Sequence, residues 1–386
     1  MLIDIVMISR IGLGDGGRET WLYNFLIETL CRNVDIRFRI FCLPVDGNSI
    51  LGTKDFVNES RVSKVEVPCN SKKIPISLQF ALSLRKAYTQ VKEKADIIIG
   101  VGGLPEALAI ILSGQKNADI SEKVMWLRTV YTKEKSDSLP VVSIPVVKFF
   151  EKYVLNKKFG TVIANGEDTA AFYREMGVAC TVIPNAISLS KFQRPKKRRS
   201  DKLRVAFVGR LAEVKGIRDF LLLVQASHEA GILDQVEYHV VGVGPFSDTV
   251  KKYHLDNKLV YHGYLSNLEM SGFLNDIDCC VALTYFTPTM GGGGVSNALI
   301  EQMAASQIII AWDNVIFKNA LKDSECFFVR QGDIKELFSI IKNVAIYDDA
   351  EEKAEQASLG AYRYSIEKHV DQFIELIVDP NVRVKI

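Results

Sequence analysis

Short apolar runs alternate with segments of helical hydrophobic period along the chain, and the alternation occurs in two successive sets. The first set contains LIDIVMI, FRIFCL, ADIIIGV, KVMWLRTV and GTVIAN, with helix-period segments such as TWLYNFLIETLCR between them. After a break at PNAISLSKFQRPKKRRSDK (184–202), the runs LRVAFVG, VEYHVVGVG, KLVYHGY, DCCVALTYF and QIIIAW repeat the rhythm. Such alternation is typical of parallel sheets buried on both faces. It predicts an α/β chain with two Rossmann-like, doubly wound domains, residues 1–185 and 203–366, joined by a linker at 186–202.

Composition supports two cores and excludes some partners. The chain has 386 residues, of which 48% are hydrophobic, and its formal net charge is only +2. This length suits two domains, and the near-neutral charge gives no bias toward nucleic acid, so no nucleic-acid partner is expected. The 7 cysteines are scattered without a CxxC pair, which favours reduced thiols over disulfides or a zinc site. The adjacent Cys279 and Cys280 are expected to be small buried side chains.

Two further features bear on localisation. The N-terminal LIDIVMIS carries an acid and lacks a basic flank, so it is interpreted as a first strand and not as a signal peptide. The chain contains no apolar stretch of the length that spans a bilayer. A soluble or peripheral protein is therefore expected, and the reduced thiols favour the cytoplasm. The basic cluster 196–199 is either a solvated linker or a contact with an anionic membrane surface, which would place the protein at the inner face of the membrane.

Two cations follow the first strand of the second set. In VGRLAEVKG (208–216), Arg210 and Lys215 flank a short loop that leads into the helical segment IRDFLLLVQ. A loop after a parallel strand lies at the carboxyl edge of the sheet, where doubly wound folds bind ligands. Fixed cations at that edge suit a diphosphate, although the same two residues are also compatible with solvated loop cations.

A glycine-rich loop precedes a helix in TMGGGGVSNALIEQMAAS (289–306). The four glycines lack Cβ atoms, so a ligand could approach the backbone amides at the helix start, where the helix dipole favours anions. Ser296 or Asn297 is expected to cap this helix. Asn297 and Glu301 are four residues apart and share a face. A carboxylate there could accept hydrogen bonds from vicinal sugar hydroxyls; the alternative is an ordinary acid on the helix surface.

Five segments occur in the order and spacing of one known family. VIPNAISLSKF, VGRLAEVKG, VVGVGP, VYHGY and GGVSNALIEQMAA are similar to the retaining glycosyltransferases of the GT-B fold, family 4 (glycosyl transferases group 1), over roughly 181–333. GDGGRETWLYNFL near the N-terminus resembles the family's first glycine loop. The resemblance implies an interdomain cleft, an acceptor-side first domain, a second domain that binds a nucleotide-sugar donor, and a C-terminal helix (367–386) returning to the first domain.

The resemblance also implies roles for individual residues. It places Arg210 and Lys215 on the donor diphosphate, where they stabilise the leaving group, and Glu301 on the ribose hydroxyls; these are the expected catalytic residues. The expected donor-binding residues are Gly16, Gly17, Gly242, Gly263, Tyr264, Gly293, Gly294, Val295, Ser296 and Asn297. The nucleotide diphosphate sugar is a substrate, and neither a cofactor nor a metal ion is expected.

The sequence departs from the family pattern at two places. The family's paired-acid motif has its first acid eight residues before Glu301, where this chain has Gly293. The family's histidine in the first domain has no counterpart, because all 5 histidines lie in the second half of the chain. Arg128 or Thr129, in the segment KVMWLRTVYT, is the candidate for that place. Whether these changes alter catalysis is left open by the sequence.

Two patterns suggest other ligands. Asp276 and Asp278 resemble the metal-binding DxD of a different glycosyltransferase fold, but they precede an apolar strand and are interpreted as structural. The glycines Gly12, Gly14 and Gly17 form the dinucleotide fingerprint GxGxxG. The acid that should end the second strand of such a site is missing, because Asp35 precedes that strand, so NAD is not expected.

The expected function is transfer of a sugar from a nucleotide diphosphate sugar to a glycan or lipid-linked glycan acceptor, with retention at the anomeric carbon. The enzyme would be of hexosyltransferase type and act in surface polysaccharide biosynthesis, a step that rests on family analogy. One alternative is a catalytically silent GT-B protein that binds nucleotide or glycan. Another is a nucleotide-sugar epimerase or hydrolase on the same fold. Turnover of donor with and without acceptor distinguishes the three.

Overall fold

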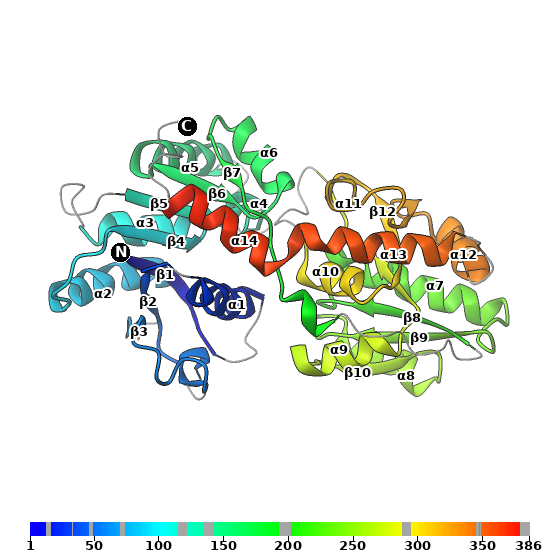
Figure 1. The fold of residues 1–386 in the computed structure, drawn as a ribbon. Helices are drawn as coiled ribbons and strands as arrows, with labels where there is room; N and C mark the ends of the chain where they lie inside the picture. Colours follow the sequence, from blue (N-terminus) through cyan, green and yellow to red (C-terminus); the bar gives the residue numbers. More distant parts are fainter. Residues whose placement is uncertain are drawn as a thin grey trace. The chain divides into compact units, whose positions relative to one another are not determined.

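The computed structural model describes residues 1–12, 17–32, 34–45, 49–69, 74–114, 122–134, 143–192, 202–287, 295–344, 347 and 349–378 (Figure 1). The chain divides into two compact units. The first unit contains Met1–Asn185 and the C-terminal segment from His369, and the second contains Ala186–Gly291 and Val295–Lys368.

The first unit is built on a parallel sheet. Over the described residues, its strands form a 7-stranded sheet in the order β3-β2-β1-β4-β5-β6-β7. The central β4 is buried along its whole length, as expected for a strand covered on both faces. The strands are β1 (Leu2–Arg10), β2 (Arg37–Leu43), β3 (Val62–Glu66), β4 (Ile97–Gly102), β5 (Glu122–Leu127), β6 (Thr161–Ala164) and β7 (Thr181–Val182).

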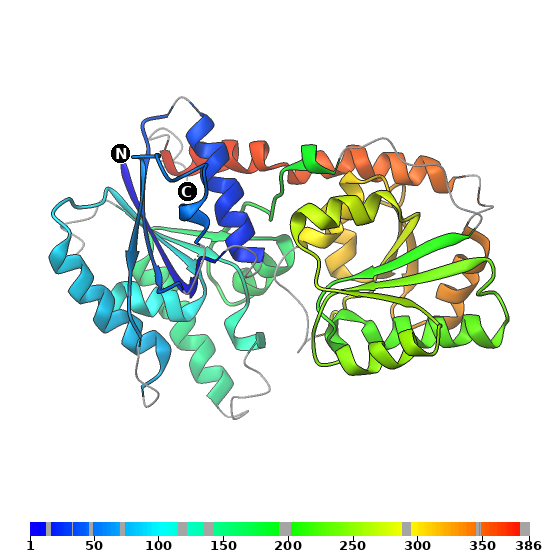
Figure 2. The ribbon, with the colours of Figure 1, turned by 90° about the horizontal axis from the view of Figure 1, so that it is seen from below.

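Helices cover both faces of this sheet. The crossover from β1 to β2 and the crossover from β4 to β5 run in opposite directions across the sheet. Because β–α–β crossovers are right-handed, the helices that follow β1 and β4 therefore lie on opposite faces. Figure 2 shows α1 and α14 on one side and α2, α3 and α5 on the other. The helices are α1 (Gly17–Cys31), α2 (Ile76–Gln90), α3 (Leu104–Leu112), α4 (Tyr131–Glu134), α5 (Ile144–Lys158), α6 (Glu167–Glu175) and α14 (Ile366–Phe373).

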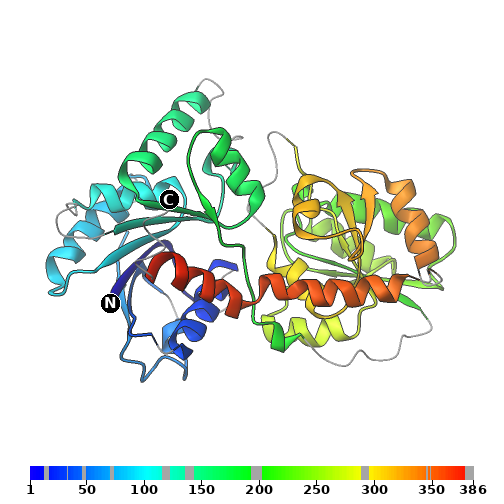
Figure 3. The ribbon, with the colours of Figure 1, turned by 45° about the horizontal axis from the view of Figure 1, so that its top comes forward.

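The C-terminal helix α14, drawn in red in Figure 3, carries His369 into the first unit. His369 stacks on Trp126 with ring centroids 5.1 Å apart, and Phe373 stacks on the same ring at 5.7 Å. Trp21 Nε1 donates to His369 Nε2 at 2.8 Å, and His369 Nδ1 donates to the carbonyl of Pro184 at 2.7 Å. Burial, with Arg128 nearby, lowers the pKa of His369 to about 3, so this histidine is a neutral packing residue.

The second unit repeats the architecture. In its described part the strands form a 6-stranded parallel sheet in the order β10-β9-β8-β11-β12-β13. The point where the strand order reverses lies between β8 and β11, and crevices at such points are the usual ligand sites of doubly wound sheets. The strands are β8 (Leu203–Val208), β9 (Val236–Val241), β10 (Val260–Gly263), β11 (Cys279–Ala282), β12 (Ile308–Asp313) and β13 (Phe327–Arg330).

The helices of the second unit also form two layers. Helix α12 packs against α7, and α13 packs against α10 and β12. The helices are α7 (Ile217–Glu229), α8 (Ser247–Leu255), α9 (Asn267–Asn275), α10 (Asn297–Ala304), α11 (Val315–Ala320), α12 (Ile334–Asn343) and α13 (Ala350–Ala361).

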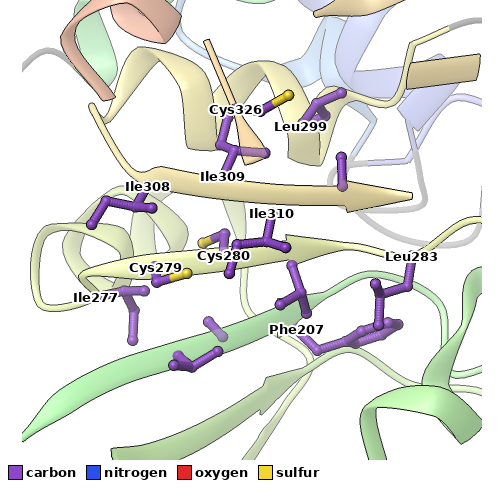
Figure 4. Packing of buried hydrophobic residues seen from close by; sticks show 14 of the residues in the cluster. Phe207, Ile277, Cys279, Cys280, Leu283, Leu299, Ile308, Ile309, Ile310 and Cys326 are labelled. Atoms are coloured by element: carbon purple, nitrogen blue, oxygen red, sulfur yellow. The ribbon is translucent and has the colours of Figure 1, made fainter. Parts of the chain in front are cut away.

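The core of the second unit contains the adjacent cysteines. Cys279 and Cys280 lie fully buried among apolar side chains such as Phe207 of β8 and Ile310 of β12 (Figure 4). None of the 7 cysteines forms a disulfide. The prediction that this pair consists of small buried side chains is confirmed. Among the described helices, none combines the length and apolar character needed to cross a membrane.

Candidate functional site

A cavity of about 160 Å³ lies at the carboxyl edge of the second sheet, where β8 and β11 end. These two strands are direct neighbours in the sheet, so the loops that leave them meet. The lining residues come from both strands, both exit loops, α10 and α11. They are Phe207, Val208, Gly209, Arg210, Lys215, Val281, Ala282, Leu283, Thr284, Ser296, Ala298, Leu299, Gln302 and Phe317.

The loop after β8 brings Arg210 and Lys215 to the cavity wall. Gly216 ends the short helical turn Glu213–Lys215 with φ +78°, and a Cβ there would lie 2.3 Å from the carbonyl oxygen of Leu283. Only glycine therefore permits this close approach to the end of β11. The backbone amide of Tyr285 also donates to the carbonyl of Val214 at 2.8 Å. The loop is thus fastened to β11, and both cations line one cavity.

Two amide side chains hold the exit of β11. Asn314 Nδ2 donates to the carbonyl of Thr284 at 3.0 Å and to Gln331 Oε1 at 2.8 Å. Gln331 Oε1 also accepts from the backbone amide of Phe286 at 3.0 Å. The first residues of the loop that leads to the glycines are therefore fixed. Sequence reasoning missed both residues, and the available signal was an Asn at the start of a helix, a common N-cap.

The N-terminus of α10 supplies the opposite side of the cavity. Ser296 caps this helix, because its hydroxyl accepts from the backbone amide of Leu299 at 3.2 Å, and Ser296 also lines the cavity. The first turn carries no acidic residue. The unpaired amides at a helix start give it a partial positive charge, which favours an anion. The two cations and this helix end together make the cavity suitable for a diphosphate.

Glu301 lies one turn inside α10. It is only 7% exposed, and burial alone raises the pKa of its carboxyl to about 7. Within the part of the chain that the structure describes, its carboxylate makes no hydrogen bond and no ion pair. Glu301 does not line the cavity, but it lies on the same helix next to the lining residue Gln302. The alternative of an ordinary acid on the helix surface is therefore wrong.

The other expected donor-binding residues are placed differently. Gly242, Gly263, Tyr264, Val295 and Asn297 are not among the lining residues. At Gly242 the chain approaches another loop closely, since a Cβ would lie 1.9 Å from the carbonyl oxygen of Gly209. Tyr264 is 58% exposed.

The remaining glycines of the expected site lie elsewhere or outside the described residues. Gly17 is the first residue of α1 in the first unit. Gly16, Gly293 and Gly294 lie outside the described residues. Sequence reasoning also missed Thr284, Ala298 and Gln302, which line the cavity.

The DxD pair lies at the other edge of the sheet. Asp278 directly precedes β11, and its carboxylate accepts from the backbone amide of Arg204 at 3.0 Å. Arg204 Nη1 donates to the carbonyl of Asp276 at 3.0 Å. These bonds join the starts of β8 and β11, whereas the cavity lies at their ends. No cluster of three His, Cys, Asp or Glu that could hold a metal ion is found among the described residues.

Arg128 follows β5 in the first unit. Its guanidinium carbon lies 4.5 Å from the centroid of the Trp21 ring, a cation–π contact. Burial, together with the neighbouring Arg18, lowers the pKa of Arg128 to about 9. Its backbone carbonyl accepts from Asn165 Nδ2 at 3.1 Å. These contacts attach Arg128 to the aromatic cluster around Trp126. That Arg128 or Thr129 takes the place of the family's histidine stays a prediction.

The comparison with known proteins gives a family match in the second unit. Residues 202–345, which contain the cavity, match the family model described as glycosyl transferases group 1. No curated protein matches the sequence significantly.

Solved structures resemble the chain over nearly its whole length. HepE from Anabaena, solved in complex with UDP, aligns with 98% of this chain and 100% of its own at 15% identity and a TM-score of 0.70. Sucrose-phosphate synthase from Thermosynechococcus elongatus aligns with 97% of this chain and 98% of its own at 17% identity and a TM-score of 0.73. The lipopolysaccharide outer core galactosyltransferase WaaB aligns with 98% and 99% of the two chains at 15% identity and a TM-score of 0.66. The chain therefore has the GT-B fold, and residues 202–345 of its second unit resemble the glycosyl transferases group 1 family.

Proposed function

We propose that this protein is a retaining glycosyltransferase that moves a sugar, most simply a hexose, from a nucleoside diphosphate sugar to a glycan or lipid-linked glycan. The observation that carries the proposal is the cavity at the ends of β8 and β11. It combines Arg210, Lys215 and the N-terminus of α10 within the matched domain. Charge that develops on a diphosphate leaving group needs such a preorganised positive environment.

The size of the cavity indicates which part of the donor it accepts. About 160 Å³ is roughly half the smallest volume of ordinary ligand sites, which begin near 300 Å³. It suits a diphosphate and not a whole nucleotide sugar. Glu301, a buried acid one turn inside α10, is the proposed acceptor of hydrogen bonds from the ribose hydroxyls. The cations and the helix end would take the role that a metal ion has in other transferases, so the reaction is proposed to be metal-independent.

An analogy with one structural neighbour supports the proposed acceptor. WaaB is a lipopolysaccharide outer core galactosyltransferase. By analogy, we place this enzyme in surface polysaccharide biosynthesis, in the cytoplasm or at the inner face of the membrane.

A thermal-shift panel of UDP, GDP, ADP, dTDP and CMP tests the donor site. A ligand at about a hundred times its dissociation constant stabilises the folded state by about 2.7 kcal/mol, so the cognate nucleotide should stand out. HepE was solved with UDP, which makes UDP the first nucleotide to test. If no nucleotide raises the melting temperature, the donor-site proposal fails.

Donor turnover then separates transfer from its alternatives. A transferase consumes donor appreciably only when acceptor is present, and the anomeric configuration of its product reports retention. Donor consumption without acceptor would indicate an epimerase or hydrolase. Nucleotide binding without any turnover would indicate a silent binding protein, which the glycine at position 293 would then explain.

A further inference from the structure

Helix α5 of the first unit carries two apolar stripes, although one is enough to attach a helix to a sheet. The inner stripe contains Val154 and Leu155, which are buried. The outer stripe consists of Val146, Phe149, Phe150 and Tyr153, which are spaced at i, i+3, i+4 and i+7 and are between 45 and 72% exposed. Phenylalanines rarely remain this exposed in a regular pattern without a partner.

Helix α2 also exposes apolar side chains on this side of the sheet. Helices α2 and α5 both pack beside α3 and lie on the same side of the sheet (Figure 2). Ile76, Leu78 and Leu82 of α2 are between 41 and 57% exposed, whereas Phe80, Ala81 and Leu84 face the core. We call the outer stripe of α5 together with Ile76, Leu78 and Leu82 the basic–apolar face.

The exposed charges that α2 and α5 themselves carry are positive. Helix α5 carries Lys148, Lys152, Lys157 and Lys158, and α2 carries Arg85 and Lys86. The acids of α2, α3 and α5 are Glu106 and Glu151, and both side chains are buried. Outward-facing acids are therefore absent from these three helices, all of which lie within the described residues. The surface complements an anionic partner.

The mixture of side chains selects the kind of partner. The cores of protein interfaces are depleted of lysine, whereas here lysines alternate with aromatic rings along one helix. At a bilayer, aromatic rings settle among the headgroups while lysine stems extend toward the phosphates. We propose that the basic–apolar face docks the first unit on an anionic lipid bilayer. This surface belongs to a different unit from the cavity, and the inference does not depend on sugar transfer.

Vesicle flotation with the full chain tests the proposal. Wild-type protein should float with vesicles of phosphatidylcholine mixed with phosphatidylglycerol and remain behind with phosphatidylcholine alone. The double variant Phe149→Ser/Phe150→Ser should lower the partition coefficient about tenfold or more, because it removes the two rings that would insert into the bilayer interface. Lys152→Glu and Lys157→Glu should each lower it about fivefold or more, and added salt should reduce that difference.

Matched variants in the second unit provide the controls. Leu222→Ser/Leu255→Ser removes two exposed apolar side chains, and Lys251→Glu reverses an exposed charge. These variants should bind vesicles like the wild type, and all variants should keep the wild-type melting temperature. The proposal would be overturned if the Phe149→Ser/Phe150→Ser variant bound vesicles as well as the wild type. It would also be overturned if the wild type bound vesicles equally well with and without phosphatidylglycerol. A wild-type oligomer that this variant converts to monomer would instead make the face a contact between copies of the chain.

Discussion

Each unit has a buried glutamate in a helix that follows a central strand, and the two acids differ in their partners. Glu106 of α3 is 4% exposed, and its carboxylate accepts from the backbone amide of Gly103 at 2.9 Å. Arg18 Nη1 lies 3.6 Å from the same carboxylate. Glu301 of α10 is 7% exposed and has no such partner among the described residues.

At the end of β4 in the first unit, the backbone leaves room for the Glu106 side chain. A Cβ on Gly102 would lie 2.2 Å from the carboxyl carbon of Glu106, so a glycine makes room for the carboxylate. Burial raises the pKa of Glu106, while the Gly103 amide and Arg18 lower it. At Glu301 only burial acts, and the pKa reaches about 7. Glu106 therefore has partners that hold its carboxylate, whereas among the described residues Glu301 has none, which agrees with the proposal that a ligand's hydroxyls bind it.

The largest expected effect is on stability. Glu301→Gln should raise the free energy of unfolding at about pH 8 by about 3 kcal/mol, since each unit of pKa displacement is worth about 1.36 kcal/mol. The folded carboxyl has the higher pKa, so wild-type stability falls as pH rises from 4.5 through about 7. The gain should therefore vanish below that window.

Urea unfolding across this pH range measures the effect, with the exposed Glu355→Gln as a control that should change nothing. Glu106→Ala should instead lower stability by about 1 to 3 kcal/mol, because the Gly103 amide loses its acceptor. Destabilisation by Glu301→Gln at about pH 8 would mean that its carboxylate has a stabilising partner after all.

The basic residues of the two units should also differ in function, one being structural and two contributing to turnover. Arg18 pairs with the structural acid, whereas Arg210 and Lys215 line the cavity. Arg210→Ala or Lys215→Ala should lower turnover about a hundredfold or more, because each removes a contact to the developing charge of the leaving group. The matched control is Arg218→Ala, which removes a nearby exposed cation outside the cavity. Wild-type kcat/KM in both cavity variants would identify the two residues as solvated loop cations.

A third test measures nucleotide affinity directly. Glu301→Ala should weaken binding by roughly 1.5 to 3 kcal/mol, about tenfold to a hundredfold, because the ribose hydroxyls lose a charge-assisted acceptor. Isothermal titration with the nucleotide found in the thermal-shift panel gives the value. Glu106→Gln should bind normally, since that acid belongs to the other unit. Unchanged nucleotide affinity in Glu301→Ala would show that Glu301 does not contribute to the donor site.

Nucleotide binding should also depend on pH. The carboxylate of Glu301 is the form that accepts from hydroxyls, and its pKa is about 7, so affinity should rise up to about tenfold between about pH 6 and pH 8. The nucleotide's own phosphate titrates in this range, so the informative quantity is the difference between wild type and Glu301→Gln. Identical pH profiles for the two proteins would contradict the assignment.

The smallest expected effect is that of a chelator. Turnover should survive EDTA, because cations and a helix N-terminus do the work of a metal ion. If EDTA abolished turnover and Mg²⁺ or Mn²⁺ restored it, Asp276 and Asp278 would become candidate metal ligands.

The sequence determined the fold class, because its signals are local. Runs such as ADIIIGV and QIIIAW are apolar throughout, and helix-period segments separate them, a pattern that only strands covered on both faces satisfy. They correspond to β4 and β12 of the two sheets. The cap at Ser296 and the loop cations Arg210 and Lys215 could also be placed, because a residue after a parallel strand must lie at the carboxyl edge.

Burial, partners and pKa values were decided only by the tertiary structure. Nothing local in NALIEQMA distinguishes a buried glutamate from an exposed one, and α10 packs against α13, which is distant in sequence. Asn314 and Gln331 reach the exit of β11 through the order of the strands, which periodicity does not encode. His369 lies at the end of the chain yet stacks on Trp126 of the first unit. Local sequence fixes which elements form, whereas contacts between residues far apart in the chain set which side chains lose water and which partners they meet.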